Sequence, residues 1–192
     1  MDRRDVPTNA SSGYYIDLSA TPFVSIDGDI SGSRLFGDAR GYLTTGEQEA
    51  LTLAARVQVG SVLGAGLSEA PADFLFYSGG GGTVRGQPYQ SLGIDTVDGA
   101  ETVTTGGTSF VGAQLEARYM VRDNIALVGF YDFGQVGATA TPGEDAEWHA
   151  GAGIGLRYNT GIGPIRLDLG TQANGDDAGR DLQVYIGIGQ AF

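Results

Sequence analysis

The sequence of 192 residues contains no cysteine, no lysine and a single histidine, His149. Without cysteine the chain has neither disulfides nor a thiol nucleophile, and one histidine does not complete the usual zinc ligand sets. No window approaches the roughly 18 consecutive apolar residues of a membrane-spanning helix, which argues against a helical membrane protein. The net charge of −12 disfavours nucleic acid as a partner, because phosphates attract basic surfaces. We therefore predict no metal, no cofactor and no nucleic-acid partner.

Two residue types stand out in the composition, arginine and glycine. All 11 basic residues are arginine, against 23 acidic residues, and the chain has 33 glycines. The planar guanidinium group suits fixed, paired positions better than the strongly hydrated ammonium group of lysine does. The cations are therefore expected in ion pairs.

Apolar and polar residues alternate along most of the chain, with the period of two that is typical of β-strands. In one segment Val111, Ala113 and Leu115 lie opposite Gln114 and Glu116. Similar alternation predicts about eight antiparallel strands, which begin near residues 14, 34, 51, 111, 125, 149, 165 and 182. Most approach the roughly 9 to 11 residues that a tilted strand needs to cross a bilayer.

The connections between these strands alternate between tight turns and long loops. Tight turns are expected at 46–48, 122–124 and 160–163, and longer loops at 26–32, 64–107, 138–146 and 172–181. Short turns on one side and long loops on the other are typical of a bacterial outer-membrane barrel. Both termini then lie on the short-turn, periplasmic side.

The polar strand faces distinguish a membrane barrel from a soluble β-sandwich, which is the alternative. They carry six arginines (34, 40, 56, 118, 157 and 166) and five acids (17, 38, 116, 132 and 168). The apolar faces mix leucine and isoleucine with much alanine and glycine, whereas a sandwich core favours large interlocking side chains. This pattern favours a barrel with a lumen of paired charges. Tyr14, Tyr119, Tyr158 and Phe192 are expected to form an aromatic girdle at the periplasmic ends.

Four blocks of sequence carry a family resemblance. They are residues 79–93 with Val84-Arg85-Gly86, then 129–136, 151–166 and 185–192. In this order and spacing they resemble the BamA/TamA-type outer-membrane assembly barrels of the bacterial surface antigen superfamily. The resemblance implies a single transmembrane β-barrel domain over 1–192, in the bacterial outer membrane, with a periplasmic turn at 1–13 and a long sixth loop at 64–107.

The resemblance also implies a loop that folds back into the lumen. The family's Val-Arg-Gly arginine pairs with acids on the two strands after the loop, and the matching residues here are Arg85, Glu116 and Asp132. The alternative places Arg85 in a solvated loop and pairs Glu116 with a neighbouring lumenal arginine. One position departs from the family pattern, because Gln87 stands where an aromatic residue usually follows the glycine, and the nearest ring is Tyr89.

The C-terminal block resembles the assembly signal of outer-membrane barrels, with Tyr185, Gly187, Gly189 and the final Phe192. As an unpaired edge, this strand can be recognised by the barrel assembly machinery through β-augmentation. Its glycines weaken or bend it, which suits a seam between the first and last strands.

The resemblance covers only the C-terminal half of a family barrel and includes no periplasmic POTRA domain. Because an open sheet edge is not viable in hydrocarbon, the outer strands must pair. They either close one barrel of about eight strands or pair between two chains in a homodimer. An eight-stranded barrel is filled by its own side chains, so a loop inside the lumen favours two chains and a loop outside favours self-closure.

These observations predict a non-enzymatic outer-membrane barrel that is related to protein assembly or translocation, in contact with lipid and lipopolysaccharide. The alternative is a passive pore or structural eight-stranded barrel without insertase activity. Glycine runs at 79–82 and 151–155 do not open a helix, so they do not fit a phosphate-binding loop. His149 has Glu147 nearby but no nucleophile at a spacing that suggests a catalytic triad.

Overall fold

The computed structural model of the chain describes residues 1–47, 50–98, 101–144, 146–176 and 178–192. Gln48 in the turn expected at 46–48 lies outside this description. So do parts of the loops expected at 64–107, 138–146 and 172–181. Within the described ranges, no helix is long and apolar enough to cross a membrane.

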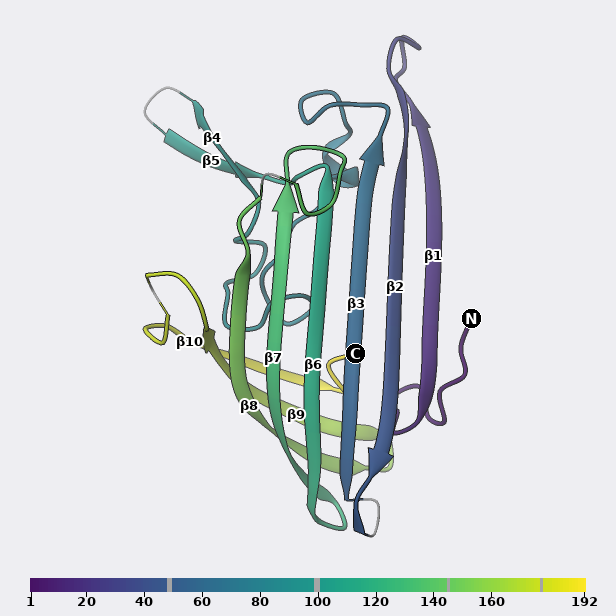
Figure 1. The fold of residues 1–192 in the computed structure, drawn as a ribbon, viewed down its shortest axis with the longest axis vertical. Helices are drawn as coiled ribbons and strands as arrows, with labels where there is room; N and C mark the ends of the chain where they lie inside the picture. Colours follow the sequence, from purple (N-terminus) through teal and green to yellow (C-terminus); the bar gives the residue numbers. More distant parts are fainter. Residues whose placement is uncertain (48–49, 99–100, 145, 177) are drawn as a thin grey trace.

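The described chain is all-β, with one short 3-10 turn at Ala72–Phe74 (Figure 1). The main sheet contains eight strands in the order β1-β2-β3-β6-β7-β8-β9-β10, and every neighbouring pair is antiparallel. Its strands are β1 (Gly13–Val24), β2 (Ser31–Thr45), β3 (Leu51–Leu63), β6 (Ser109–Arg122), β7 (Ile125–Gly137), β8 (His149–Thr160), β9 (Gly163–Gln172) and β10 (Leu182–Ile188). A separate hairpin of β4 (Ile94–Asp98) and β5 (Glu101–Thr105) lies within the loop after β3. The predicted all-β, antiparallel barrel fold of about eight strands is confirmed, although β1 and β10 do not pair with each other.

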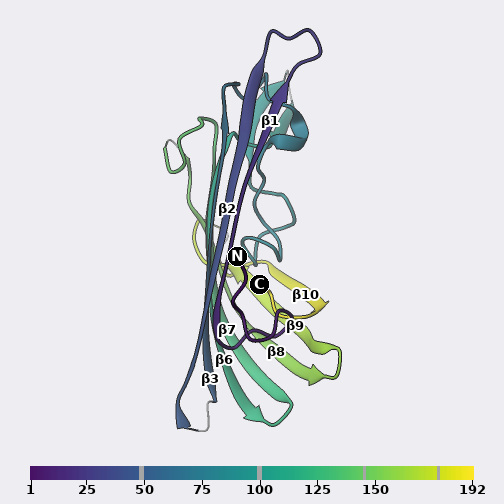
Figure 2. The same cartoon turned by 90° about the vertical axis from the view of Figure 1, so that its right-hand side faces the viewer.

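The sheet curls, so that β8, β9 and β10 swing out of the plane of β1 and β2 (Figure 2). Its concave face carries buried charged residues such as Glu116 and Asp132, which are 3% and 0% exposed. The convex face carries exposed apolar residues such as Ile154 and Leu115, which are 67% and 49% exposed. A soluble protein would bury the apolar face, so this arrangement identifies the convex face as the lipid-facing one and the concave face as the lumen.

Part of the connection from β3 to β6 lies on the concave side of the sheet (Figure 2), whereas its β4–β5 hairpin projects beyond the sheet (Figure 1). An apolar cluster holds its base, in which Phe76 from the loop packs with Val62, Phe110 and Val136 from three strands. Phe76 and Gly107 also exchange two backbone hydrogen bonds of 2.8 Å. This base directs the middle of the loop into the lumen.

Residues at the two ends of the chain meet at the short-turn side of the sheet. Residues 1–12 precede β1, and Met1 exchanges two backbone hydrogen bonds with Ile16 on the outer edge of that strand. Phe192 packs with Ala10, Tyr42 and Ala54 on the lumenal side. The first residues of the chain therefore extend the sheet by a short paired segment at one end of β1.

The predicted aromatic girdle needs one correction. Tyr14, Tyr119 and Tyr158 are exposed near the short turns, as a girdle requires, but Phe192 is only 6% exposed. Gly189 has a φ of +92°, which turns the chain out of the direction of β10. The ring of Phe192 therefore fills a space beneath Tyr42 and does not face lipid.

The assignment of the two faces predicts a sharp difference between two isoleucine-to-arginine substitutions. Ile154→Arg places a charge on the lipid face in the middle of β8, and it should destabilise the folded barrel by about 2–4 kcal/mol. Ile162→Arg changes an exposed turn residue that faces water and should have little effect. Urea titration of the heat-modifiable form in lipid vesicles measures both. Equal losses for the two variants would contradict the assigned faces.

Candidate functional site

The tip of the long loop crosses the concave face of the sheet. Val84 and Arg85 are completely buried there. Gly86 has a φ of +96°, and a Cβ at this position would overlap the backbone of Thr171 in β9. Only glycine therefore lets the loop lie this close to the strand. The motif Val84-Arg85-Gly86 thus holds the loop backbone against the wall of the lumen.

The guanidinium group of Arg85 is bound by two carboxylates. Its Nε and Nη2 atoms donate to the two oxygens of Asp132 at 2.7 and 2.8 Å, and its Nη1 atom donates to Glu116 at 2.5 Å. The backbone N–H of Arg85 donates to Asp132 as well, at 3.1 Å. The same guanidinium lies over the ring of Phe130, 3.7 Å from its centroid. The structure thus brings together the three residues that the sequence singled out for a lumenal ion pair.

The ion pair is part of a larger network that the sequence did not predict as a unit. Asp168 in β9 accepts from Arg85 at 3.3 Å and from Arg157 in β8. Arg118 donates to the second oxygen of Glu116 at 2.7 Å. The alternative partner expected for Glu116, a neighbouring lumenal arginine, is therefore present in addition to Arg85. Three arginines and three carboxylates balance one another in this network.

Burial makes the network sensitive to the loss of any member. Burial alone acts against the charged form of Arg85, but the hydrogen bonds and charges of Asp132 and Glu116 raise its pKa above the ordinary value. The charged Arg85 balances the network, whereas its removal would leave one uncompensated negative charge and would take from Asp132 its ion-pair partner. We name this network the loop anchor; its members are Arg85, Arg118, Arg157, Glu116, Asp132 and Asp168.

Glycines on the lumenal face of β8 make room for the loop anchor. A Cβ on Gly151 would overlap the carbonyl oxygen of Arg85, and one on Gly155 would overlap the carboxylate of Asp168. A Cβ on Gly153 would meet the ring of Phe130. The glycine run at 151–155 thus lets the loop backbone and the buried charges approach the strand.

Tyr185 connects the loop tip to β10, the last strand of the sheet. Its hydroxyl accepts a hydrogen bond from the N–H of Gly86 at 3.0 Å and donates to the carbonyl of Gln87 at 3.1 Å. Gln87 itself is buried, whereas Tyr89 is 80% exposed. The ring that seats the loop tip therefore comes from the last strand and not from the loop.

The other residues predicted for the assembly signal are divided between two environments. Gly187 lies within β10, opposite Arg166 of β9. Gly189 and Phe192 follow the end of the strand, where the chain turns toward the lumen.

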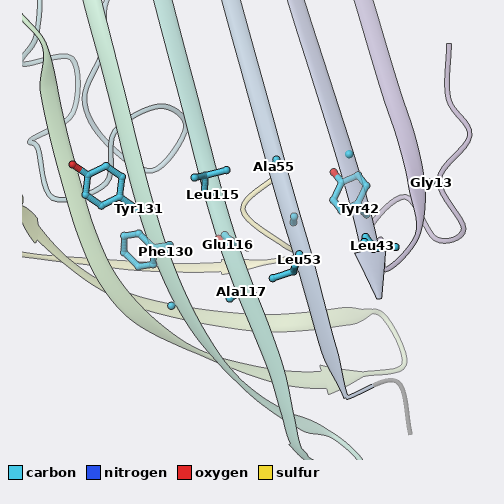
Figure 3. Close-up of a pocket in the computed structure, with 13 residues that line it drawn as sticks. Gly13, Tyr42, Leu43, Leu53, Ala55, Leu115, Glu116, Ala117, Phe130 and Tyr131 are labelled. Carbon is cyan, nitrogen blue, oxygen red and sulfur yellow. The ribbon is translucent and has the colours of Figure 1, made fainter. Parts of the chain in front are cut away.

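A separate hollow lies on the lipid-facing side of the sheet (Figure 3). Gly41 and Gly129 leave open space there, between the side chains of Leu53, Leu115 and Tyr131. Glu116 borders the hollow only from behind, because its carboxylate is bound to Arg85 on the other face. The hollow offers apolar contact to lipid and is distinct from the loop anchor.

Fold and site together define a class of protein, a membrane β-barrel sheet whose long loop is anchored in the lumen by a buried arginine. A family model described as the Omp85 superfamily domain matches residues 1–192, and the chain belongs to the Omp85 superfamily. It is an outer-membrane protein of the BamA/TamA type.

Two known proteins are similar to this chain over much of its length. The crystal structure of BamA from Haemophilus ducreyi lacking POTRA domains 1–3 matches with a TM-score of 0.76 and 18% identity, over 95% of this chain and 40% of that one. The outer envelope protein 80, chloroplastic, of Arabidopsis thaliana is 32% identical over 137 residues, which are 65% of this chain and 18% of the relative. The first likeness shows the fold alone, and the chain spans less than half of either protein.

The loop anchor predicts that Arg85→Ala strongly lowers the stability of the folded barrel. Asp132 would lose its ion-pair partner and Glu116 one of its partners, and the folded barrel should lose about 3–5 kcal/mol of stability. Arg3→Ala, which removes an exposed arginine in the N-terminal segment, is the matched control. Urea titration of the heat-modifiable form in detergent or vesicles compares the two. A loss below about 1 kcal/mol for Arg85→Ala, as for an exposed ion pair, would contradict a buried anchor.

The glycines of β8 predict a position-specific effect of a single methyl group. Gly151→Ala should displace the loop tip, because the new Cβ meets the carbonyl of Arg85, and the loop should become sensitive to protease. Gly129→Ala on the neighbouring strand adds the same methyl group to open space on the lipid face and should leave protection unchanged. Limited proteolysis of the folded protein provides the measurement. Equal protection of the two variants would show that the loop does not touch β8.

Proposed function

We propose that this chain takes part in the assembly or translocation of outer-membrane proteins by offering a strand edge to a client strand. The observation that carries the proposal is that, in the part of the chain that the structure describes, no strand of the sheet pairs with the outer edge of β10 or with the outer edge of β1 beyond Ile16. A free edge with a row of unsatisfied N–H and C=O groups is a template for β-augmentation. In hydrocarbon each unsatisfied group costs several kcal/mol, so such an edge favours pairing with an incoming strand.

Hydrogen bonds at each edge identify which residues face outward. Ile16 bonds to Met1 on the outer side of β1, and Gly189 donates to Pro164 on the inner side of β10. The backbone N–H and C=O groups of successive residues in an antiparallel strand point alternately to its two neighbouring strands. In both β1 and β10, the backbone groups of the even-numbered residues therefore point away from the sheet. We call these the edge residues: Leu18, Ala20, Pro22 and Val24 in β1, and Leu182, Val184, Ile186 and Ile188 in β10.

Two features weaken these edges and suit a seam that opens. Pro22 has no N–H to donate, and proline is tolerated in sheets mainly at such an edge. β10 has only seven residues, against 12 in β1, and it contains Gly187. A short glycine-containing strand pairs less strongly than a long β-branched one, so a client strand can compete for its partner.

The loop anchor supports this function by holding the seam strand in place. Tyr185 of β10 binds the loop tip, and the loop tip is fixed to β6, β7 and β9 through Arg85. One edge is therefore positioned by the lumen while its outer side stays free. The BamA and outer envelope protein 80 relatives are longer chains, so their activities as whole proteins extend to this chain only by proposal.

We also propose that the role is non-enzymatic, with outer-membrane lipid and lipopolysaccharide around the barrel and the barrel assembly machinery acting on the C-terminal strand. Among the residues that the structure describes, no cluster of three or more His, Asp or Glu residues is placed to hold a metal. A passive pore or structural barrel is the second candidate function; for it the charge-balanced loop anchor would only hold the barrel together. The two candidates differ in whether the edges act on a client.

Reconstituted vesicles distinguish the two functions. The protein should accelerate the folding of a small eight-stranded client barrel, followed by its heat-modifiable gel shift. Ala20→Pro removes one outward N–H from β1 and should reduce the acceleration, whereas Ala20→Val keeps that group and should preserve it. Steady conductance in planar bilayers without accelerated client folding would contradict assembly and support the passive pore.

A further inference from the structure

We propose that the hollow on the lipid-facing side of the sheet binds an acyl chain of a glycerophospholipid from the periplasmic leaflet, and that Arg3 binds the phosphate of the same lipid. The proposal rests on the assignment of the two faces of the sheet and does not depend on the proposed role in assembly.

The hollow is a groove that crosses the sheet from β1 to β7 (Figure 3). Small residues of paired strands form its floor, because Gly41 lies opposite Ala55 and Ala117 lies opposite Gly129. Its volume is about 740 Å³, within the roughly 300–1,000 Å³ that is typical of small-molecule sites. The groove is continuous with the exposed apolar surface of the convex face. Hydrocarbon chains are therefore the chemistry that it meets and fits.

The position of the groove along the strands places it in the periplasmic half of the membrane. It includes Leu43, near the end of β2 at Thr45, and it ends at Tyr131, midway along β7. Farther along the same face, Ser61 and Gln135 donate hydrogen bonds to carbonyls of the loop between β7 and β8. These polar contacts mark the opposite border of the lipid face. The groove thus runs from the short-turn side to the middle of the bilayer.

The length of the groove matches one leaflet of the bilayer. Between β1 and β7 it crosses four strand-to-strand spacings of about 4.8 Å each, which gives about 19 Å. Barrel strands are tilted by about 45°, so a groove perpendicular to them rises by about 13 Å along the membrane normal. Half of the hydrocarbon core of about 30 Å is about 15 Å. One acyl chain that lies in the groove can therefore span its leaflet.

Arg3 lies where the groove reaches the periplasmic interface. Its backbone N–H donates to the carbonyl of Tyr14 at 2.9 Å, and a Cβ on Gly13, which lines the groove, would lie 2.1 Å from the carbonyl oxygen of Arg3. The next residue, Arg4, lies over the ring of Tyr15 on the lumenal side. Because side chains alternate along an extended segment, Arg3 is on the lipid-facing side, beside Tyr14.

The charge of Arg3 is complementary to a phosphate. Its side chain is exposed, and it has no ion-pair partner among the residues that the structure describes. A guanidinium group binds two phosphate oxygens at once through its parallel N–H donors. Such an exposed contact adds little to the stability of the fold. Its effect should therefore be on the bound lipid.

Leaflet and charge together decide the class of lipid. Lipopolysaccharide occupies the outer leaflet of an outer membrane, so its phosphates lie at the far end of the strands from Arg3. Glycerophospholipids form the periplasmic leaflet, and their phosphates lie at the level of Arg3 and of the exposed Tyr14. The structure therefore favours a glycerophospholipid over lipopolysaccharide in this groove.

Two matched alanine-to-leucine substitutions test the groove. Ala55 lines it, whereas Ala39 lies outside it on the same face of β2, and both are exposed. The barrel extracted from outer membranes in mild detergent should retain a glycerophospholipid that native mass spectrometry detects. Ala55→Leu should lower this retention by about tenfold, because the larger side chain takes the space of the acyl chain. Ala39→Leu should retain the lipid as the unchanged protein does.

Reversal of the charge at Arg3 tests the phosphate contact independently. Arg3→Glu should lower retention by about tenfold, because a carboxylate repels the phosphate. Arg3→Lys keeps the charge and should retain most of the lipid. A higher salt concentration should lower retention by the unchanged protein, since the contact is exposed to water.

Three results would overturn the proposal. Retention of lipopolysaccharide in place of a glycerophospholipid would contradict the leaflet. Equal retention by Ala55→Leu and Ala39→Leu, or no lipid on the unchanged protein, would show that lipid surrounds the barrel without a defined site. The heat-modifiable gel shift reports whether each variant is folded, and Arg3→Glu decides the question if Ala55→Leu does not fold. None of these results affects the client-folding assay, so the two proposals fail separately.

Discussion

The bond between Arg85 and its two carboxylates is the constraint on which the rest of the structure depends. A guanidinium taken out of water needs both Asp132 and Glu116, and these acids lie on adjacent strands, β6 and β7. Once the loop is fixed there, the strand facing its backbone must lack side chains, which explains Gly151. The last strand must provide a hydroxyl for the loop tip, which explains Tyr185. Loop, lumen and seam strand are therefore parts of one arrangement.

The unusual composition follows from the same arrangement. A cation in a lumen with little water is costly unless it is paired, and the forked guanidinium of Arg85 bonds two carboxylates at once where an ammonium acts as a point charge. The lipid face has the opposite requirement, because there any unpaired charge is costly. Ile154 and Leu115 can stay exposed only because their solvent is hydrocarbon. One face of the sheet is thus suited to hydrocarbon and the other to a lumen of paired charges.

Alternation of residue types is enough to predict the strands and their faces. Leu115 and Glu116 are assigned to opposite sides by this pattern alone, and the structure has them so. Alternation does not predict which residues of different strands lie close together, because a period of two says which side a residue faces but not what lies across from it. Asp168 was therefore predicted as lumenal without being linked to Arg85. Phe192 was misplaced because the turn at Gly189 depends on contacts with Tyr42 and Ala10 that lie far away in sequence.

The edges of the sheet show two requirements acting against each other. Hydrocarbon demands that every edge group be paired, which favours long, regular outer strands. Pro22 in β1 and Gly187 in β10 make both outer strands weaker pairing partners than the strands between them. Yet Gly187 also lets Arg166 lie across the strand, so the residue that weakens backbone pairing makes room for a charge at the same edge.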